Sequence, residues 1–426
     1  MISSYKIYRL LLFLGDIFLG IFSLFIVIVL KFGFSLNYFN LHLKYFSVVL
    51  LFFVFIGFLL KIFSPEKNFN QKEFLKKNLI AFLLSLVFSF IYFYLFVRTI
   101  SPKTNLILFW LIFVTLSIYT KRKFAQYFYH HRQINLILFG SKKQFLRLIN
   151  DLNNNPQLGF KVFILKDYEK IAKVPNPKLI ILPPKFNPQK LINEYQQYLL
   201  NSMSVLNFYE QVFEYLPLDY LTEKDILTIT AKERKIYFGI KRVVDIIFGF
   251  LLFLIFILLF PFISLGILLS SPGPIFFKQK RIGQNEKEIT ILKFRTLHQE
   301  KQNVWITQEE KEIFPLGKFL RKFHLDELPQ SILILKGDLS LIGPRPEQTA
   351  IVQKLKKEIP YYSLRHLIKP GLTGWAQINI GKIPDIEGTK RKLEYDLFYL
   401  KNQNLFFDFV IIFNTLRAIF EFSKHF

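Results

Sequence analysis

Four long apolar segments that precede residue 122 constrain the fold of this chain more than any other feature. They cover residues 10–30, 45–60, 79–97 and 106–119. A helix needs about 20 apolar residues to cross the hydrocarbon core of a bilayer, and the first and third segments are long enough. The second and fourth are shorter and need their flanking lysines to extend to the interface. The pattern predicts a transmembrane region of four helices over residues 1–122, with buried helices of a soluble domain as the alternative.

Composition and charge favour a membrane protein. The chain has 426 residues, of which 52% are hydrophobic, and a net charge of +25. A nucleic-acid-binding protein would concentrate such charge on an otherwise ordinary soluble domain. Here the basic residues lie between apolar segments, as in membrane proteins, so we expect no nucleic-acid partner. The absence of cysteine excludes disulfides and thiolate nucleophiles, and His298, His324 and His366 have no metal-binding spacing.

The basic residues also predict the orientation of the four helices. Lysine and arginine are denser after the second and fourth segments than after the first and third. These residues are Lys61, Lys67, Lys72, Lys76 and Lys77 after the second segment, and Lys121, Arg122, Lys123 and Arg132 after the fourth. Because positive residues stay on the cytoplasmic side, the N-terminus and the chain after residue 119 are predicted to be cytoplasmic.

Residues 134–231 have the pattern of a small soluble α/β domain. The predicted strands are 134–139, 161–165 and 179–182, and the predicted helices are 145–152 and 191–200. Alternating strands and helices favour a parallel, Rossmann-like sheet. A loop that binds a dinucleotide needs several glycines, and only Gly140 follows the first strand. We therefore predict a degenerate Rossmann-like domain with a structural or regulatory role.

A fifth apolar stretch, 246–277, contains no charged residue. Its centre, 246–270, is long enough to span a membrane, but Pro261 interrupts it, and proline kinks helices. Basic residues flank both ends, with Lys241 and Arg242 before the stretch and Lys278, Lys280 and Arg281 after it. Because these residues favour the same side of the membrane for both ends, we predict a re-entrant membrane helix kinked at Pro261.

The chain around and after this helix, 236–426, has the pattern of an α+β domain. Two strands are predicted at 275–278 and 288–297, with turns rich in glycine and proline between later elements. The apolar segment 406–420 predicts an amphipathic helix, either on the membrane surface or in the core. The whole chain is thus predicted to be a multidomain membrane α/β protein.

The chemistry of the C-terminal region centres on the adjacent acids Asp326 and Glu327. At a helix start or a turn, both carboxylates can converge on one metal ion, so that one binds Mg²⁺ while the other attacks phosphorus. The alternative is helix capping, because acids in a first helical turn, here with Pro329 close by, stabilise the helix dipole. The pair by itself leaves both interpretations open.

Arginines near this pair favour phosphate chemistry. Arg321 lies five residues before Asp326, and Arg345 lies between two prolines that restrict its backbone. A guanidinium binds two phosphate oxygens at once and keeps its charge, which suits a transferring phosphoryl group. Lys293 and Arg295 lie at alternate positions of a predicted strand and can bring further positive charge to a bound phosphate.

Residues 236–426 resemble the bacterial sugar transferase family, the monotopic polyprenyl-phosphate phosphoglycosyl transferases that begin capsule, exopolysaccharide and O-antigen synthesis. The resemblance rests on six motifs in order, Lys241-Arg-Val-Val-Asp245, Ser271-Pro-Gly-Pro274, Lys293-Phe-Arg-Thr296, Leu325-Asp-Glu-Leu-Pro-Gln330, Gly343-Pro-Arg-Pro346 and Lys369-Pro-Gly-Leu-Thr-Gly-Trp-Ala-Gln377. The N-terminal half resembles the large form of the family, in layout more than in motif.

The resemblance implies a re-entrant helix that carries a cytoplasmic catalytic layer at the inner membrane of a bacterium. It implies that Asp326 is the nucleophile, that Glu327 is a Mg²⁺ ligand, and that Arg321 and Arg345 bind donor phosphates. The implied reaction moves a sugar 1-phosphate from a UDP-sugar to undecaprenyl or another polyprenyl phosphate, through a phosphosugar–Asp intermediate with release of UMP. The family often has an arginine shortly after the last motif, and Lys382 is expected to take its phosphate contact.

Two other functions stay open at this point. A membrane glycosyltransferase would move only the sugar and release UDP, and Asp385 and Glu387 have a spacing that can bind a metal ion. A non-catalytic membrane scaffold for polysaccharide export is the other, and the presence of Asp326, Glu327 and Arg345 argues against it. The sequence does not identify the transferred sugar or decide whether the chain forms a homo-oligomer.

Overall fold

The computed structural model describes residues 4–60, 62–63, 71–97, 103–131, 134–175, 178–184, 186, 189, 196–230, 234–298, 313–381 and 385–420. The chain divides into two compact units, Met1–Ser204 and Val205–Phe426. The boundary falls inside residues 134–231, which the sequence pattern assigned to one domain. The helices α7 (Val205–Val212) and α8 (Glu223–Thr230) therefore belong to the second unit.

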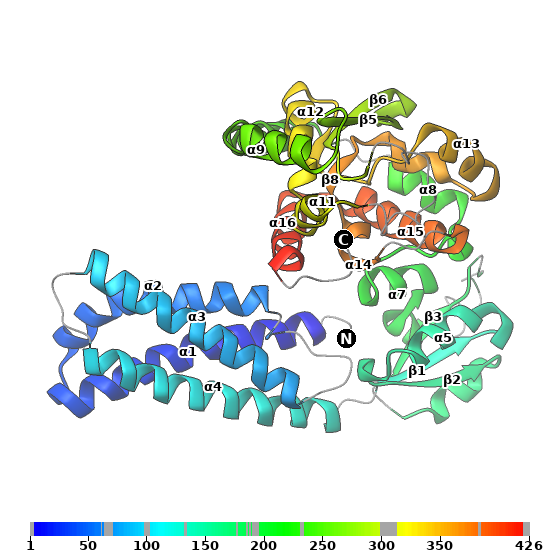
Figure 1. Ribbon diagram of the computed structural model, residues 1–426. Helices are drawn as coiled ribbons and strands as arrows, with labels where there is room; N and C mark the ends of the chain where they lie inside the picture. The colour runs from blue at the N-terminus through cyan, green and yellow to red at the C-terminus, as the bar shows by residue number, and fades with distance from the viewer. Residues whose placement is uncertain are drawn as a thin grey trace. The chain divides into compact units, whose positions relative to one another are not determined.

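The first unit begins with long apolar helices, as predicted (Figure 1, blue to cyan). They are α1 (Ser4–Phe32), α2 (Leu36–Leu59), α3 (Gln71–Phe96) and α4 (Lys103–His131). Each contains a stretch of 20 to 23 residues that is long and apolar enough to cross a membrane. The helices α2 and α4 are longer than the apolar segments in the sequence, because helical structure continues through polar residues such as Asn37 and Lys123.

A buried ion pair links two of these helices. Lys121 Nζ on α4 lies 2.5 Å from Asp16 Oδ2 on α1, and the two side chains are 2% and 1% exposed. Ser117 Oγ donates to the other oxygen of Asp16 at 2.7 Å, and Lys121 also donates to Asn78 Oδ1 at 3.3 Å. Because a charge among apolar side chains is tolerated only when it is paired, this cluster stabilises one arrangement of α1, α3 and α4.

A parallel sheet follows these helices, which confirms the predicted strand pattern. Its strands are β1 (Ile134–Phe139), β2 (Phe160–Leu165), β3 (Lys178–Leu182) and β4 (Ser202–Ser204), in the order β2-β1-β3-β4. Helix α5 (Leu146–Asn153) connects the first two strands. The predicted helix 191–200 falls partly outside the described residues, and Gln196–Asn201 forms a 3₁₀ helix.

The second unit is mixed α and β. The strands β5 (Phe276–Ile282) and β6 (Glu288–Phe294) form an antiparallel hairpin, and β7 (Ser340–Ile342) pairs in parallel with β8 (Gly371–Thr373). Its other helices are α9 (Lys235–Ser270), α11 (Pro315–Lys322), α12 (Ser331–Lys336), α13 (Thr349–Glu358), α14 (Trp375–Asn379), α15 (Ile386–Asn402) and α16 (Leu405–Phe420).

Helix α9 lies against the rest of this unit along most of its length. Toward its N-terminal end, Gly249 allows close packing, since a Cβ there would lie 2.9 Å from the side chain of Ile334. Further along, Phe256, Ile263 and Ile267 are buried together with side chains from later elements. Those side chains are Phe294, Phe314, Leu320 and Leu328. The helix continues through Pro261, so this proline does not end it.

The opposite side of α9 is apolar and exposed. Its exposed residues include Val243, Ile247, Phe250, Leu254, Leu258, Phe262, Leu265 and Leu269. This spacing repeats every three or four residues, which places the side chains on one stripe of the helix. Helix α9 is the fifth helix in the described residues that is long and apolar enough to cross a membrane.

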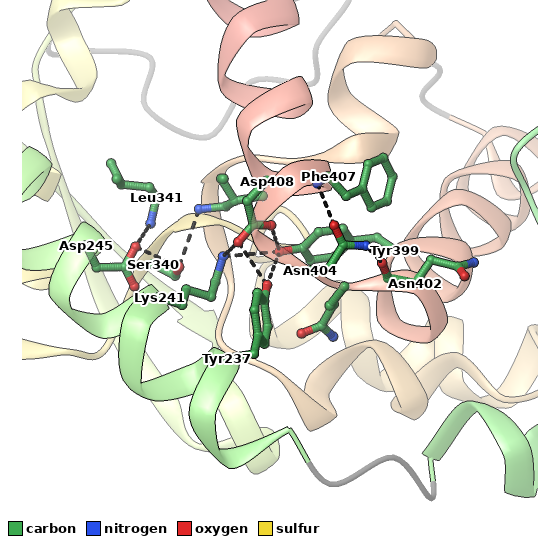
Figure 2. A network of polar contacts seen from close by, with 12 residues as sticks. Tyr237, Lys241, Asp245, Ser340, Leu341, Tyr399, Asn402, Asn404, Phe407 and Asp408 are labelled. Carbon is green, nitrogen blue, oxygen red and sulfur yellow. Dashed lines mark hydrogen bonds and ion pairs between the residues drawn. The ribbon is translucent and has the colours of Figure 1, made fainter. Parts of the chain in front are cut away.

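Polar contacts attach the N-terminal part of α9 to elements far along the chain (Figure 2). Lys241 Nζ lies 2.9 Å from Asp408 Oδ2 on α16 and donates to Tyr399 Oη on α15 at 3.1 Å. One turn further, Asp245 Oδ1 accepts hydrogen bonds from Ser340 Oγ at 3.0 Å and from Leu341 N at 2.9 Å. The first of the six motifs therefore fastens α9 to α15, α16 and β7.

Helix α16 has one buried and one exposed side. Ile411 is fully buried and Asp408 is 7% exposed, whereas Phe406 and Phe409 are 77% and 60% exposed. The helix is therefore amphipathic, as the sequence predicts, with its polar anchor at Asp408 turned toward α9.

Candidate active site

Asp326 and Glu327 lie in a 3₁₀ helix, Leu325–Gln330, directly after α11. His324 takes the left-handed conformation (φ 55°) between the two helices, which ends α11 and turns the chain. The two acids are 8% and 9% exposed. Both acids lie in the first turn of this 3₁₀ helix, where their charge also suits the helix dipole, and no side-chain hydrogen bond caps the helix.

Two cationic side chains from different parts of the chain contact the carboxylate of Glu327. Lys293 Nζ on β6 lies 2.5 Å from Glu327 Oε1, and Arg345 Nη2 lies 2.9 Å from the same oxygen. The Lys293 side chain is 19% exposed and that of Arg345 is 38% exposed. Three of the sequence motifs thus converge at one carboxylate, and the Arg345 guanidinium retains a solvent-facing side.

The two neighbouring acids have opposite electrostatic environments. Burial acts to raise the pKa of Glu327, but Arg345 and Lys293 outweigh it and hold that pKa below its usual value. Burial raises the pKa of Asp326 to about 6, and the charge of Glu327 adds to this effect. Separation of two adjacent carboxyl pKa values is typical of sites where the two groups have different chemical roles.

The Asp326 carboxylate has no hydrogen bond or ion pair to any residue that the structure describes. The nearby charges of Lys293, Arg321 and Arg345 lower its pKa, but less than burial raises it. An unpaired carboxylate keeps its electron density available, whereas one held by two cations does not. Within the pair, Glu327 is therefore the carboxylate that holds the two cations, and Asp326 is the one left open.

Arg321 lies at the end of α11, close to the dyad. Its Nε donates to Thr296 Oγ1 at 2.8 Å, which ties the arginine to the segment after β6. The positive charge of Arg321 acts to lower the pKa of Asp326. The structure therefore brings Arg321, Arg345 and Lys293 to the two acids.

Arg295 differs from the expectation. It is 2% exposed, and its guanidinium donates to the turn between α9 and β5. The acceptors are Pro274 O at 2.7 Å, Ser271 Oγ at 2.9 Å, Pro272 O at 3.0 Å and Ser271 O at 2.7 Å. Because these bonds use four of its five N–H groups, Arg295 holds the turn and is not available to a phosphate. Lys382 lies outside the described residues.

One arginine of the site was not singled out by the sequence. Arg281 on β5 donates from Nη1 to Pro346 O at 2.5 Å, beside Arg345. Burial lowers the pKa of Arg281, and the charge of Arg345 lowers it further. In the sequence, Arg281 belongs to the basic cluster that flanks the apolar stretch, so its position suggested contact with the membrane surface.

Mg²⁺ fits the chemistry of the dyad. The described residues contain no group of three or more His, Cys, Asp or Glu side chains that could hold a metal ion. Mg²⁺ is nevertheless commonly bound by one or two carboxylates together with water and substrate phosphates. Adjacent Asp326 and Glu327 are such a donor set, and Glu327 has its second oxygen free of the two cations on Oε1.

The other acid pair and the histidines have structural explanations. Asp385 caps α15 by accepting a hydrogen bond from Gly388 N at 2.6 Å, and Glu387 lies in the first turn of that helix. His366 is 7% exposed, and burial lowers its pKa to about 4. His298 packs edge-on against Phe314.

Comparison with known proteins identifies the C-terminal part of the chain. A family model described as bacterial sugar transferase matches residues 236–422. The UDP-N-acetylgalactosamine-undecaprenyl-phosphate N-acetylgalactosaminephosphotransferase of Aeromonas hydrophila is 39% identical over 205 residues, which are 47% of this chain and 48% of that protein.

Two glucose-1-phosphate transferases are also similar. The UDP-glucose:undecaprenyl-phosphate glucose-1-phosphate transferase of Escherichia coli (strain K12) is 39% identical over 182 residues, 42% of this chain and 39% of that protein. The protein of the same name from Caulobacter vibrioides is 35% identical over 184 residues, 42% of this chain and 69% of that protein. The chain thus spans about half or less of the first two relatives and more than two thirds of the third.

Proposed function

Since the chain belongs to the bacterial sugar transferase family, we propose that it transfers a sugar 1-phosphate from a UDP-sugar to undecaprenyl phosphate or a similar polyprenyl phosphate. Three relatives carry names of this reaction type, with UDP-N-acetylgalactosamine or UDP-glucose as the donor. The observation that carries the proposal is the unpaired, nine-tenths buried carboxylate of Asp326 beside Glu327, which holds Lys293 and Arg345.

In the first step, a carboxylate oxygen of Asp326 attacks the β-phosphorus of the UDP-sugar. A bond forms between this oxygen and phosphorus, and the bond from phosphorus to the bridging oxygen breaks. UMP leaves with the electron pair of the broken bond, and the sugar phosphate stays on Asp326 as an acyl phosphate. Arg345 and Arg321 offset the negative charge that develops on the phosphate oxygens.

In the second step, a phosphate oxygen of the polyprenyl phosphate attacks the same phosphorus. The bond between Asp326 and phosphorus breaks, and the carboxylate is restored as polyprenyl diphosphate sugar forms. Two steps let a hydrophilic donor and a lipid acceptor use one site in turn. Glu327, with phosphate oxygens, would hold Mg²⁺, which neutralises phosphate charge when it is bound.

We propose that α9 anchors this site in the membrane with both of its ends on the cytoplasmic side. Its contacts with the catalytic layer extend from Asp245 to Ile267, a distance of roughly 33 Å along a helix. A helix that crossed the bilayer with these contacts intact would carry the polar layer through a hydrocarbon core of about 30 Å. A helix that lies within one leaflet exposes only its apolar stripe to lipid.

The four helices of the first unit complete a multi-pass protein of the bacterial inner membrane in this proposal. The basic residues after the second and fourth helices support a cytoplasmic position for the chain after residue 119, where UDP-sugars are available. The parallel sheet of 134–204 is proposed as a structural or regulatory element of Rossmann-like type.

The test of the function is the identity of the nucleotide product. Purified membranes that contain the protein are incubated with polyprenyl phosphate and, in turn, UDP-glucose, UDP-galactose and the UDP-N-acetylhexosamines. We expect UMP release with at least one donor, and no release above background for Asp326→Asn. Release of UDP would support a glycosyltransferase instead, although Asp385 caps α15 and Glu387 lies in its first turn.

A further inference from the structure

The short loop that carries Arg345 is held at every carbonyl from Pro344 to Glu347. Each of these four oxygens accepts a hydrogen bond from another segment. The donors, in chain order, are Gly371 N at 3.0 Å, Arg365 Nη2 at 3.0 Å, Arg281 Nη1 at 2.5 Å and Ile282 N at 3.0 Å. The loop is therefore held through its backbone, and two of the four hydrogen-bond donors are arginine side chains.

Arg365 donates the hydrogen bond to the carbonyl oxygen of Arg345 itself. It lies in the 3₁₀ helix Tyr362–Leu367, and its side chain is 4% exposed. Its Nη2 also lies 2.9 Å from Asp396 Oδ2 on α15, and its Nη1 donates to Tyr362 Oη at 2.7 Å. Asp396 is 2% exposed, so the pair is fully enclosed and cannot contact a substrate.

This hydrogen bond fixes the backbone from which the Arg345 side chain extends. Pro344 has a fixed φ, and Pro346 restricts Arg345 to extended conformations. The rotation about the Cα–C bond of Arg345, its ψ angle, is set by the direction of its carbonyl oxygen. The bond from Arg365 fixes that direction, while the exposed face of the Arg345 guanidinium stays free for an anion beside Glu327.

We propose that Arg365, held by Asp396 and Tyr362, is a positioning residue that aims the Arg345 guanidinium at the donor phosphates. This inference rests on the phosphate-binding role of Arg345 in the proposed function. Lysine cannot replace Arg365 in this role, because a single ammonium does not match three acceptors that are arranged around a planar guanidinium.

A double-mutant cycle tests the inference, with purified protein, a UDP-sugar that the enzyme uses and polyprenyl phosphate. Arg365→Lys is expected to lower kcat/KM for the UDP-sugar by about tenfold to a hundredfold. The loss should divide between kcat and KM as it does in Arg345→Ala. In the Arg345→Ala background, Arg365→Lys should lower kcat/KM no further, because the residue that it aims is gone.

Arg391→Lys is the matched control. Arg391 is an arginine on α15, the helix whose Asp396 pairs with Arg365, and its guanidinium lies over the Tyr215 ring at 3.8 Å, with an ion pair to Glu394 at 3.5 Å. Neither contact reaches the loop of Arg345. Its replacement should change kcat/KM by less than threefold and to the same degree with and without Arg345.

The outcomes separate the inference from the proposed function. Equal losses for Arg365→Lys with and without Arg345 would overturn the inference, because the effect would then be a general structural one. Full activity of Arg345→Ala would overturn the role of Arg345 in the proposed function as well. If Arg365→Lys does not fold, Tyr362→Phe removes one bond to Arg365, and its loss of about threefold should likewise vanish in the Arg345→Ala background.

Discussion

Two buried charge clusters, one in each unit, differ in how their charges are matched. Among the helices of the first unit, Asp16 meets one lysine, and Ser117 and Asn78 complete the hydrogen bonds. In the second unit, one oxygen of Glu327 receives both Lys293 and Arg345, while the adjacent Asp326 receives no partner from the described residues.

The difference indicates which cluster is structural and which is prepared for a ligand. The Asp16 cluster is closed, since each charge has its counter-charge and almost no surface. The Glu327 cluster has Lys293, Arg321, Arg345 and nearby Arg281 against Asp326, Glu327 and nearby Glu347, so positive charge is in excess. A buried excess of positive charge is stabilised when an anion such as a diphosphate binds.

The largest expected effect is that of Glu327→Gln on transfer. This change leaves Lys293 and Arg345 without their carboxylate and removes the proposed cation ligand. We expect UMP release to fall by about 10³-fold. Glu288→Gln on β6 removes an exposed partner of Lys280 at 2.8 Å and should change the rate by less than twofold. More than a tenth of wild-type activity in Glu327→Gln would contradict the distinction between the clusters.

Asp16→Asn should act on stability rather than on chemistry. It leaves Lys121 buried without its counter-charge, which costs about 3–5 kcal/mol. We expect a lower melting temperature in detergent or nanodiscs but an unchanged transfer rate per folded molecule. The double variant Asp16→Asn with Lys121→Met removes both charges and should recover most of the stability. A double variant as unstable as the single one would show that the pair itself is not the cause.

Lys293→Met should increase the affinity of the nucleotide-free protein for a divalent cation. Lys293 occupies Glu327 in the structure, and its removal leaves this carboxylate open to a metal ion. We expect Mn²⁺, followed by electron paramagnetic resonance of the free ion, to bind about tenfold more tightly, a gain of about 1.4 kcal/mol. Lys280→Met, an exposed lysine on β5, is the control. Equal Mn²⁺ affinity in both variants would contradict the prediction.

The smallest effect concerns pH and His366. Burial lowers its folded pKa to about 4, so the unfolded chain takes up a proton near pH 6.5 while the folded protein does not. The contribution of neutral, buried His366 to the free energy of unfolding is complete above about pH 6.5. It is lost as pH falls toward 4. We expect His366→Asn to lessen the fall in stability between pH 7 and 5 by about 1 kcal/mol. Glu286, at 3.7 Å, and the charges of Arg365 and Lys356 face the ring. Identical pH profiles of melting temperature in both proteins would show that His366 does not contribute.

Much of the fold could be predicted from periodicity. Apolar segments of membrane-spanning length gave α1 to α4, and buried strands followed by polar turns gave β1, β2 and β3. The boundary between the two units at residue 204 could not be predicted, because the sequence where β4 meets α7 lacks the glycine and proline residues that are typical of a linker. It depends on tertiary packing, such as the hydrogen bond from Leu218 N to Glu394 Oε1.

The site shows the same division. Asp326, Glu327 and Arg345 could be selected as candidates by residue type and by the rigid segments around them. The separate roles of Arg295 and Arg281 could not be predicted, because two arginines on neighbouring strands look equivalent in a sequence. Only the three-dimensional structure shows that Arg295 donates to the turn after α9 while Arg281 fixes the loop of Arg345.

The most direct test of the account is a search for a covalent intermediate on Asp326. The purified protein is incubated with the UDP-sugar in the absence of lipid acceptor and measured by intact mass and peptide mapping. The account predicts a mass increase of one sugar phosphate on the peptide that contains Asp326, and its disappearance when polyprenyl phosphate is added. Turnover without any adduct, or an adduct on a different residue, would contradict it.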